Sequence, residues 1–415
     1  MIFSLYPVFL MRILITEEAL QDGFGHWPSY VGDIATGLRS LGDEVDVAVH
    51  RNATQNIIAR VGGTPWFSRN CWIDPKSQGA MGGLVHNLIF FRELLSWLRN
   101  HQSYDWICAF TIRLQHLLAF ALLARSGTIP RKTRFFLLFV QGFGRYAGHG
   151  KPTEFPKNLS TMLARFCFWL LTPAARSGRV VVAAETKGMK DELERFTGLP
   201  VTLAPHPVHF TDSSKTTLST TFRSQVSGFI PLPLTITCPG FARHEKGTDL
   251  LQDAIRILLS RPDADRFRFV LQWPEPFAML DDTIIGPNPA LLKDSRVEFL
   301  NQNLNSEEYD ALLNRTNLII LPYRRSSYHH RVSRVAIEAA GRGLPMIYSK
   351  GTWSEEVADL VGSGVVIADE SAENVVKSIL KASDEFSDLA ILTGSGACRV
   401  REYHSVESLR SILKS

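Results

Sequence analysis

The residues best suited to chemistry lie in a loop from Pro239 to Gly247, which follows an apolar strand pattern and precedes a helical one. Gly240 permits a tight exit from the strand. Arg243 and Lys246 place two cations three residues apart, beside the start of the next helix. A guanidinium fork, an ammonium point charge and the free N–H groups of a helix N-terminus together suit a diphosphate. The alternative is an ordinary solvated basic turn.

A second group of candidates lies between Tyr323 and Pro345. The basic loop RRSSYHHR follows a strand pattern, and a helix is predicted from about 332 to 342, where Gly343 and Pro345 end it. Arg331 and Ser333 stand at the start of this helix. Because helix N-termini attract anions, both residues are candidates for phosphate contacts.

Glu338 lies inside the apolar run VAIEAA of the same predicted helix. A carboxylate among apolar neighbours is costly unless it has a hydrogen-bond donor or an opposite charge. Ligand hydroxyl groups are one source of donors, and a buried salt bridge is the other. The sequence alone leaves both interpretations open.

The turn after the first predicted strand contains Gly23, Gly25 and His26. Glycines there let the backbone approach a phosphate or a sugar, although two glycines at this spacing are a weak signal. His26 is equally a ligand contact or a plain loop histidine. His116 is predicted to be a packed surface histidine on a helix.

These candidates must be positioned by short apolar segments that alternate with helical ones. Strands are predicted near 11–16, 44–49, 104–110, 134–140, 179–185 and 200–206, and again near 234–238, 267–273, 297–301, 317–323, 345–349 and 365–369. Segments such as RVVVAA are apolar on both faces, as a sheet covered by helices on each side requires. The alternation predicts two parallel α/β sheets, and such sheets bind ligands beyond the carboxyl ends of their strands.

A break in this pattern marks a domain boundary. Ten of the 17 residues from 211 to 227 are Ser or Thr, without an apolar period, which indicates a linker. The predicted parts are an N-terminal domain over 1–208, a linker over 209–232, a second domain over 233–395 and a helical tail over 396–415. Within the first part, residues 1–10 lack the basic leader and cleavage site of a signal peptide and are interpreted as a flexible extension.

Composition excludes several classes of protein. The chain has 415 residues, of which 45% are hydrophobic and 21% charged, so it can bury two cores and is not disordered as a whole. No apolar run approaches the roughly 18 residues of a membrane span. The five cysteines form no CxxC pair and are expected to be reduced, as in the cytoplasm. Neither a zinc-ligand spacing nor a Ser-His-Asp order is present.

The net charge of +4 is unevenly distributed. Residues 1–208 hold 22 Lys and Arg against 15 Asp and Glu, and the remainder holds 23 against 26. From Arg125 to Lys190 there are twelve basic residues and two acids. Such a field favours an anionic partner, either a membrane surface, a phosphorylated acceptor or nucleic acid, although a merely solvated face is the alternative. The usual nucleic-acid motifs are absent, so no nucleic acid is expected. The apolar stretch 163–171 is predicted to be a core helix rather than an interfacial one.

The order of motifs in the second half resembles that of family 4 glycosyltransferases. The match covers about 234–370 and consists of Gly240, Arg243 and Lys246-Gly247, then Glu338-Ala339-Ala340-Gly341-Arg342-Gly343-Leu344-Pro345, then Lys350-Gly351-Thr352-Trp353-Ser354-Glu355-Glu356. The first half matches only in outline. The resemblance implies an α/β protein of the GT-B fold, with two Rossmann-like parallel-sheet domains facing across a cleft.

The resemblance also implies an activity: retaining, metal-independent transfer of a hexose from a nucleotide sugar to a saccharide or lipid-linked acceptor. The setting it implies is bacterial surface polysaccharide biosynthesis, in the cytoplasm or at the inner face of an anionic membrane, without a cofactor. Arg243 and Lys246 would neutralise the donor diphosphate as charge builds up on the leaving group. Glu338 would hold the ribose hydroxyls. The remaining donor-side residues would be Gly240, His330, Arg331 and Ser333.

Two positions depart from the family pattern. His330 stands where members usually carry a second glutamate, and Gln141 stands where many carry a histidine. Gln141 can hydrogen-bond a sugar hydroxyl but cannot act as a base. It joins the candidates for the acceptor side, which are Gly23, Gly25, His26 and Gln141. Either departure is compatible with an altered choice of donor or with a protein that binds without catalysing. Two alternatives therefore stay open on the same fold: a non-catalytic nucleotide-sugar-binding protein and a sugar-nucleotide epimerase.

Overall fold

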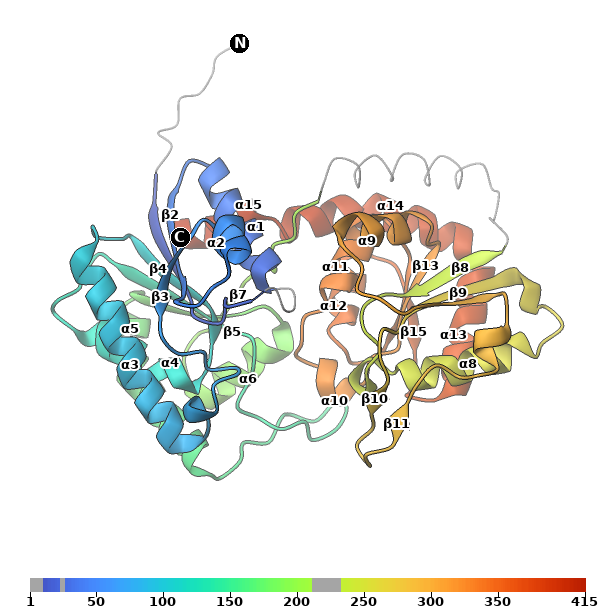
Figure 1. Cartoon of the computed structure of the whole chain (residues 1–415), viewed down its shortest axis with the longest axis horizontal. Helices are drawn as coiled ribbons and strands as arrows, with labels where there is room; N and C mark the ends of the chain where they lie inside the picture. Colours follow the sequence, from blue (N-terminus) through green and yellow to red (C-terminus); the bar gives the residue numbers. More distant parts are fainter. Residues whose placement is uncertain (1–9, 23–26, 211–232) are drawn as a thin grey trace, which may run out of the picture. The chain divides into compact units, whose positions relative to one another are not determined.

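The computed structural model describes residues 10–22, 27–210 and 233–415. The chain divides into two compact units, each built on its own parallel sheet (Figure 1). The first unit comprises Met1–Ala147, Lys151–Pro207 and Ser405–Ser415, and the second comprises Gly148–Gly150 and Val208–His404. The predicted turn residues Gly23, Gly25 and His26 lie outside the described residues, as does most of the predicted linker.

The sheet of the first unit has the order β3-β2-β1-β4-β5-β6-β7, and every neighbouring pair is parallel. Its strands are β1 (Arg12–Glu17), β2 (Glu44–His50), β3 (Gly63–Phe67), β4 (Trp106–Ile112), β5 (Arg134–Phe139), β6 (Val180–Ala184) and β7 (Thr202–Leu203). The sequence did not predict β3, whose Gly-Thr-Pro-Trp-Phe segment has no strand-like pattern. Proline lacks the N–H of a sheet ladder and is tolerated here because β3 is an edge strand.

Helices cover both faces of this sheet. They are α1 (Trp27–Ser40), α2 (Gln55–Val61), α3 (Gly79–Asn100), α4 (Leu114–Arg125), α5 (Leu159–Arg176), α6 (Lys187–Thr197) and α15 (Val406–Lys414). One core joins residues of α3, α4, α5 and α6 to the sheet, and a separate core joins α1, α2 and α15 to it. Residues 106 to 110 of β4 alternate between the two cores, as a strand buried on both faces requires.

The sheet of the second unit has the order β12-β9-β8-β13-β14-β15 and is also parallel throughout. Its strands are β8 (Leu234–Cys238), β9 (Phe267–Gln272), β12 (Val297–Leu300), β13 (Leu318–Leu321), β14 (Met346–Ser349) and β15 (Val365–Ile367). All six lie where the sequence predicts them. A short antiparallel pair, β10 (Phe277–Ala278) and β11 (Ile284–Ile285), was not predicted.

The helices of the second unit are α8 (Thr248–Leu259), α9 (Ser306–Asn314), α10 (Arg325–Tyr328), α11 (Arg334–Gly341), α12 (Ser354–Val361), α13 (Ala372–Asp384) and α14 (Phe386–Tyr403). Helix α14 packs on α11 and α12. The chain then returns to the first unit, where α15 packs on α1 and the Arg410 guanidinium donates to the buried Asp43 carboxylate at 2.6 and 2.7 Å. The C-terminal segment is therefore shared between the units.

All five cysteines are free thiols, four of them buried. Among the helices that the structure describes, none is both long enough and apolar enough to cross a membrane.

Candidate functional site

The loop after β8 positions the predicted diphosphate-binding residues of the second unit. Gly240 has φ +82°, a left-handed conformation that favours glycine. Its N–H donates to the Gln272 side-chain oxygen at the end of β9, at 2.7 Å. A Cβ atom at Gly240 would collide with the Lys246 ammonium group. The backbone conformation therefore favours glycine here, and the Lys246 ammonium group lies directly beside it.

Lys246 ends the 3₁₀ turn His244–Lys246 that leads into α8. The side chain is half-buried, and burial of the ammonium group, with a smaller contribution from Arg243, lowers the pKa of Lys246 to about 8. Glu245 raises this pKa slightly, but no carboxylate among the described residues forms a salt bridge with the ammonium group. A desolvated cation without a close counter-ion is a good receptor for an anion.

Gly247 makes the turn from this loop into α8. Its φ is +63°, and a Cβ atom here would strike the carbonyl oxygen of Pro322, just beyond β13. The first turn of α8 therefore lies directly beside the segment after β13, as the carboxyl ends of neighbouring parallel strands predict.

Two further cations lie around Glu245. The Arg243 guanidinium is 4.0 Å from the Glu245 carboxylate and about half exposed. The Arg331 guanidinium approaches the same oxygen to 3.8 Å and also lies over the Tyr328 ring. The structure thus brings Gly240, Arg243, Lys246 and Arg331 together, with Glu245 between the two arginines. The sequence did not single out Glu245, because an acid beside a lysine is common on any surface.

The other arginines of the RRSSYHHR loop are engaged in the fold. Arg324 is largely buried, pairs with Asp249 of α8 and Glu370, and donates to the His244 carbonyl at 3.1 Å. Arg325 donates to the Lys350 carbonyl at 2.6 Å. Both residues hold the loops in place, so their positive charge is already compensated or bound to backbone.

Ser333 and His330 both have contacts within the fold. Ser333 is buried and caps α11, since its hydroxyl oxygen accepts the Ala336 N–H at 3.3 Å. The same hydroxyl donates to the Tyr323 hydroxyl at 3.4 Å. His330 is half-buried and packs against the ring of His329, with centroids 4.0 Å apart.

Glu338 has a salt-bridge partner within its own helix. The Arg334 guanidinium donates to the Glu338 carboxylate at 2.8 Å, one turn earlier in α11. The buried hydroxyl of Tyr309 faces the same carboxylate, and burial followed by the Glu338 charge raises the pKa of Tyr309. The structure thus shows the salt bridge that the sequence suggested, while the role of Glu338 toward ligand hydroxyls stays a prediction.

Gln141 lies in the first unit, two residues beyond β5, and its side chain is exposed. This position at the carboxyl edge of the sheet is the one predicted for an acceptor-side residue.

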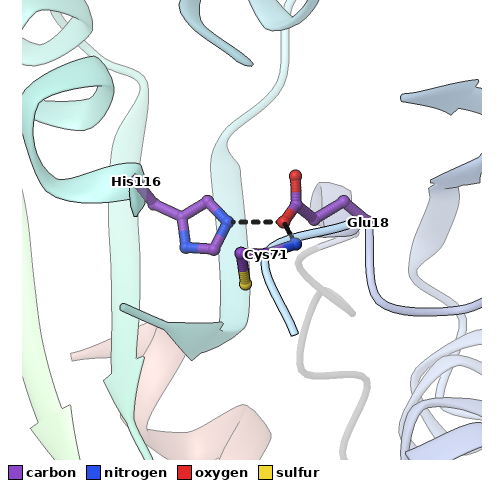
Figure 2. A group of neighbouring side chains, drawn as sticks. All are labelled: Glu18, Cys71 and His116. Atoms are coloured by element: carbon purple, nitrogen blue, oxygen red, sulfur yellow. Dashed lines mark hydrogen bonds and ion pairs between the residues drawn. The ribbon is translucent and has the colours of Figure 1, made fainter. Parts of the chain in front are cut away.

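A buried carboxylate cluster lies in the first unit, at the carboxyl end of β1, and the sequence did not indicate it. Glu18 is 3% exposed and lies between two imidazoles, with the His86 Nε2 atom 2.8 Å away and the His116 Nε2 atom 3.1 Å away (Figure 2 shows His116). The Cys71 backbone N–H donates to Glu18 at 2.8 Å. Burial alone would raise the pKa of Glu18, but the two histidines overcome this and hold it well below its usual range. His116 is buried, so the prediction of a surface histidine is wrong.

The same cluster has the donor types of a metal site, because ligand atoms of Glu18, Cys71 and His116 lie within 4.8 Å of one another. Two observations argue for a hydrogen-bonded cluster instead. The His116 Nδ1 atom accepts the Arg113 N–H at 3.2 Å, which places the proton of a neutral ring on Nε2, the atom that faces Glu18. Burial, followed by the Glu18 charge, raises the pKa of the Cys71 thiol, which disfavours the thiolate that a metal needs.

Glu17 and Glu185 extend the row of buried acids along this sheet edge. Glu17 accepts the Thr111 hydroxyl of β4 at 2.6 Å, and burial raises the pKa of Glu17 to about 8. Glu185 follows β6 and accepts the Tyr30 hydroxyl at 2.7 Å, with His206 Nδ1 at 2.9 Å. The available sequence signal was an acid directly after a buried strand.

Comparison with known proteins shows the fold. No protein-family model and no curated protein sequence matches the chain. Among solved structures, Anabaena HepE in complex with UDP is 15% identical, with a TM-score of 0.63, over 97% of this chain and 98% of that one. A glycosyltransferase from Rickettsia africae is 14% identical, with a TM-score of 0.63, over 98% and 97%.

A candidate UDP-N-acetylglucosamine 2-epimerase from Listeria monocytogenes is also similar, at 16% identity and a TM-score of 0.53, over 97% of this chain and 95% of that one. Identities this low establish a shared fold and not a shared reaction. They confirm the prediction of a GT-B fold with two parallel-sheet α/β units, while membership of family 4 stays a prediction.

Proposed function

We propose that this protein is a glycosyltransferase that takes a sugar from a nucleotide diphosphate donor held by its second unit. The observation that carries the proposal is Lys246, a desolvated ammonium group without a salt-bridge partner among the described residues. It lies beside Arg243 and Arg331, in a loop that opens a helix at the carboxyl edge of a parallel sheet. This is the arrangement that a diphosphate needs.

In this proposal the cations act on the leaving group. When the bond between the sugar and the diphosphate breaks, negative charge grows on the departing oxygen. Lys246 and the two arginines are already in place and need little reorganisation, so they stabilise that charge more than they stabilise the ground state. The N–H groups at the start of α8 add the positive end of a helix dipole. We propose that no residue acts as a general acid at the leaving oxygen. We also propose that the transfer retains the anomeric configuration of the donor sugar.

Glu338 is proposed to bind the ribose hydroxyls, with its carboxylate held in place by the salt bridge from Arg334. Glu338→Gln is therefore expected to lower the affinity for UDP about tenfold, the cost of a charge-assisted hydrogen bond. Affinity for inorganic pyrophosphate, which has no ribose, should stay unchanged. Isothermal calorimetry with both ligands measures the difference.

A matched control for this substitution is Asp310→Asn, which removes the other acid that pairs with an arginine of the α11 segment, Arg342. It should leave both affinities unchanged. An equal loss of UDP and pyrophosphate binding in Glu338→Gln would contradict the ribose assignment and indicate a general effect on α11.

The acceptor is proposed to be a saccharide or a lipid-linked saccharide bound by the first unit, as in the assembly of bacterial surface polysaccharides. The excess of positive charge in that unit supports an anionic acceptor, peripheral contact with an anionic membrane, or both. Gln141 lies at the sheet edge where such an acceptor would bind.

A thermal-shift screen of UDP-, GDP-, ADP- and dTDP-sugars tests the proposed function, because a bound donor raises the melting temperature by mass action. UDP-sugars come first, since HepE was solved with UDP. The donor that binds is then incubated without an acceptor. An epimerase would release an altered nucleotide sugar, whereas a transferase would release the sugar only slowly, by hydrolysis. Absence of any stabilising nucleotide sugar would remove the proposal.

A further inference from the structure

Helix α5 is apolar on two opposite faces. One face packs into the core of the first unit through Ala164, Cys167, Phe168 and Leu171. The opposite face exposes Leu159 (66%), Met162 (66%), Phe166 (50%) and Trp169 (67%). A helix that packs against the protein on one side needs only one apolar face. A helix with apolar residues on all sides is normally buried on all sides. The sequence prediction of a core helix therefore describes only half of α5.

The four exposed residues form one continuous strip, called here the α5 stripe. They are spaced by three or four positions, which places them on one side of the helix along about 15 Å of its axis. The rings of Phe166 and Trp169 lie against each other, with centroids 5.9 Å apart. Isolated exposed apolar residues are common, but a contiguous strip with two large aromatic side chains marks an interaction surface.

Basic residues lie on and next to α5. The segment from 155 to 184 contains no acidic residue, and its exposed cations lie before the helix at Lys157, within it at Arg165 and at its end at Arg176. Arg125 of the neighbouring helix α4 is also exposed and donates to the Leu170 carbonyl at 3.5 Å. The partner of this surface must accept apolar side chains at its centre and supply negative charge around them.

We propose that the α5 stripe inserts into the interface of an anionic lipid bilayer, with α5 parallel to the membrane plane. Tryptophan and phenylalanine are the residues that prefer this region, and basic residues around them attract anionic headgroups. A second copy of the chain fits less well, because it would bring two positively charged surfaces together. The inference locates the membrane contact proposed above and does not depend on the transfer reaction.

The test is co-sedimentation of the full chain with phosphatidylcholine vesicles that either contain or lack phosphatidylglycerol. The wild type should bind the anionic vesicles, and added salt should weaken this binding. The double substitution Phe166→Ser and Trp169→Ser should lower the affinity at least tenfold, since it removes the most interfacial side chains. Its melting temperature should hold, because both residues are exposed. The matched control, Leu280→Ser with Leu292→Ser, removes exposed apolar residues of the second unit and should bind as the wild type does.

The proposal would be overturned if the wild type did not bind anionic vesicles, or if the double variant bound them as well as the wild type. It would also be overturned if the wild type bound no vesicles but was a dimer in sedimentation equilibrium, and the double variant was a monomer. The thermal shift with UDP-sugars separates this proposal from the proposed function. A protein that binds vesicles through the α5 stripe and binds no nucleotide sugar supports the membrane site and rejects the transferase.

Discussion

Replacing Lys246 by alanine is expected to lower the affinity for UDP by about one to two orders of magnitude. The ammonium group is the one desolvated cation of the loop after β8, and hydrogen bonds from charged groups contribute about 1.5–3 kcal/mol. Calorimetric titration with UDP measures the loss. Lys293→Ala, at an exposed lysine of the same unit, is the matched control and should bind UDP with wild-type affinity.

The pH dependence of binding identifies Lys246 more specifically. Its pKa in the ligand-free protein is lowered to about 8, and a bound diphosphate favours the charged form. Above pH 8, UDP must therefore bind together with a proton, and the affinity should fall by up to tenfold per pH unit. Lys246→Arg keeps its charge throughout this range, so its UDP affinity should stay nearly constant. A wild-type affinity that is flat between pH 8 and 9.5 would contradict the assignment.

Whereas the UDP affinity should fall above pH 8, the stability of the ligand-free protein should increase with pH in this range. A lysine whose pKa is lower in the folded state penalises folding while it is charged, and this penalty disappears as the pH rises from 8 towards 10.5. Lys246→Met should thus melt above the wild type at pH 7 while it binds UDP poorly. Loss of binding with a gain of stability is typical of a functional position and excludes misfolding as the cause.

The sequence was sufficient for the sheets because their strands carry a local signal. Segments such as LIIL in β13 and VVVAA in β6 are apolar on both faces, which is the pattern of a parallel sheet covered by helices. The edge strand β3 lacks this signal, because only its pairing with β2 makes it a strand. The return of α15 to the first unit was also beyond prediction, since an amphipathic helix does not show which surface it covers.

The candidate site also contains residues with a local sequence signal and residues whose roles depend on the folded geometry. The loop from 239 to 247 was recognisable because its glycines and cations lie close together in the chain, while its contacts with Gln272, Pro322 and Arg331 were not. Ser333 and Glu338 were recognised by residue type, but whether a cap, a salt bridge or a ligand uses each of them depends on geometry. The Glu18 cluster was not predictable, because His86 is 68 residues from Glu18 and no spacing rule connects them.

The second large effect is expected at Glu18. Glu18→Gln replaces an acceptor-only carboxylate by an amide whose NH₂ group must face an N–H donor, from His86, His116 or the Cys71 backbone. Breaking a buried charged network of this kind costs about 3–5 kcal/mol. Urea unfolding at pH 7, followed by circular dichroism, should show this loss in the free energy of unfolding. Because the pKa of Glu18 is held below its ordinary value of 4.5, its stabilising contribution is present above pH 4.5 and fades as the pH falls below it.

Glu17→Gln is the matched control, and we expect it to change the free energy of unfolding in the opposite direction. Burial raises the pKa of Glu17 to about 8, so the unfolded chain loses this proton near pH 4.5 while the folded protein keeps it. The contribution of Glu17 to stability is therefore full below pH 4.5 and declines as the pH rises to 8. Glu17→Gln removes that decline and should be more stable than the wild type at pH 8, by about 2 kcal/mol after the cost of a buried amide. If Glu17→Gln and Glu18→Gln changed the free energy of unfolding in the same direction at pH 8, this result would show that the histidines do not keep Glu18 ionised.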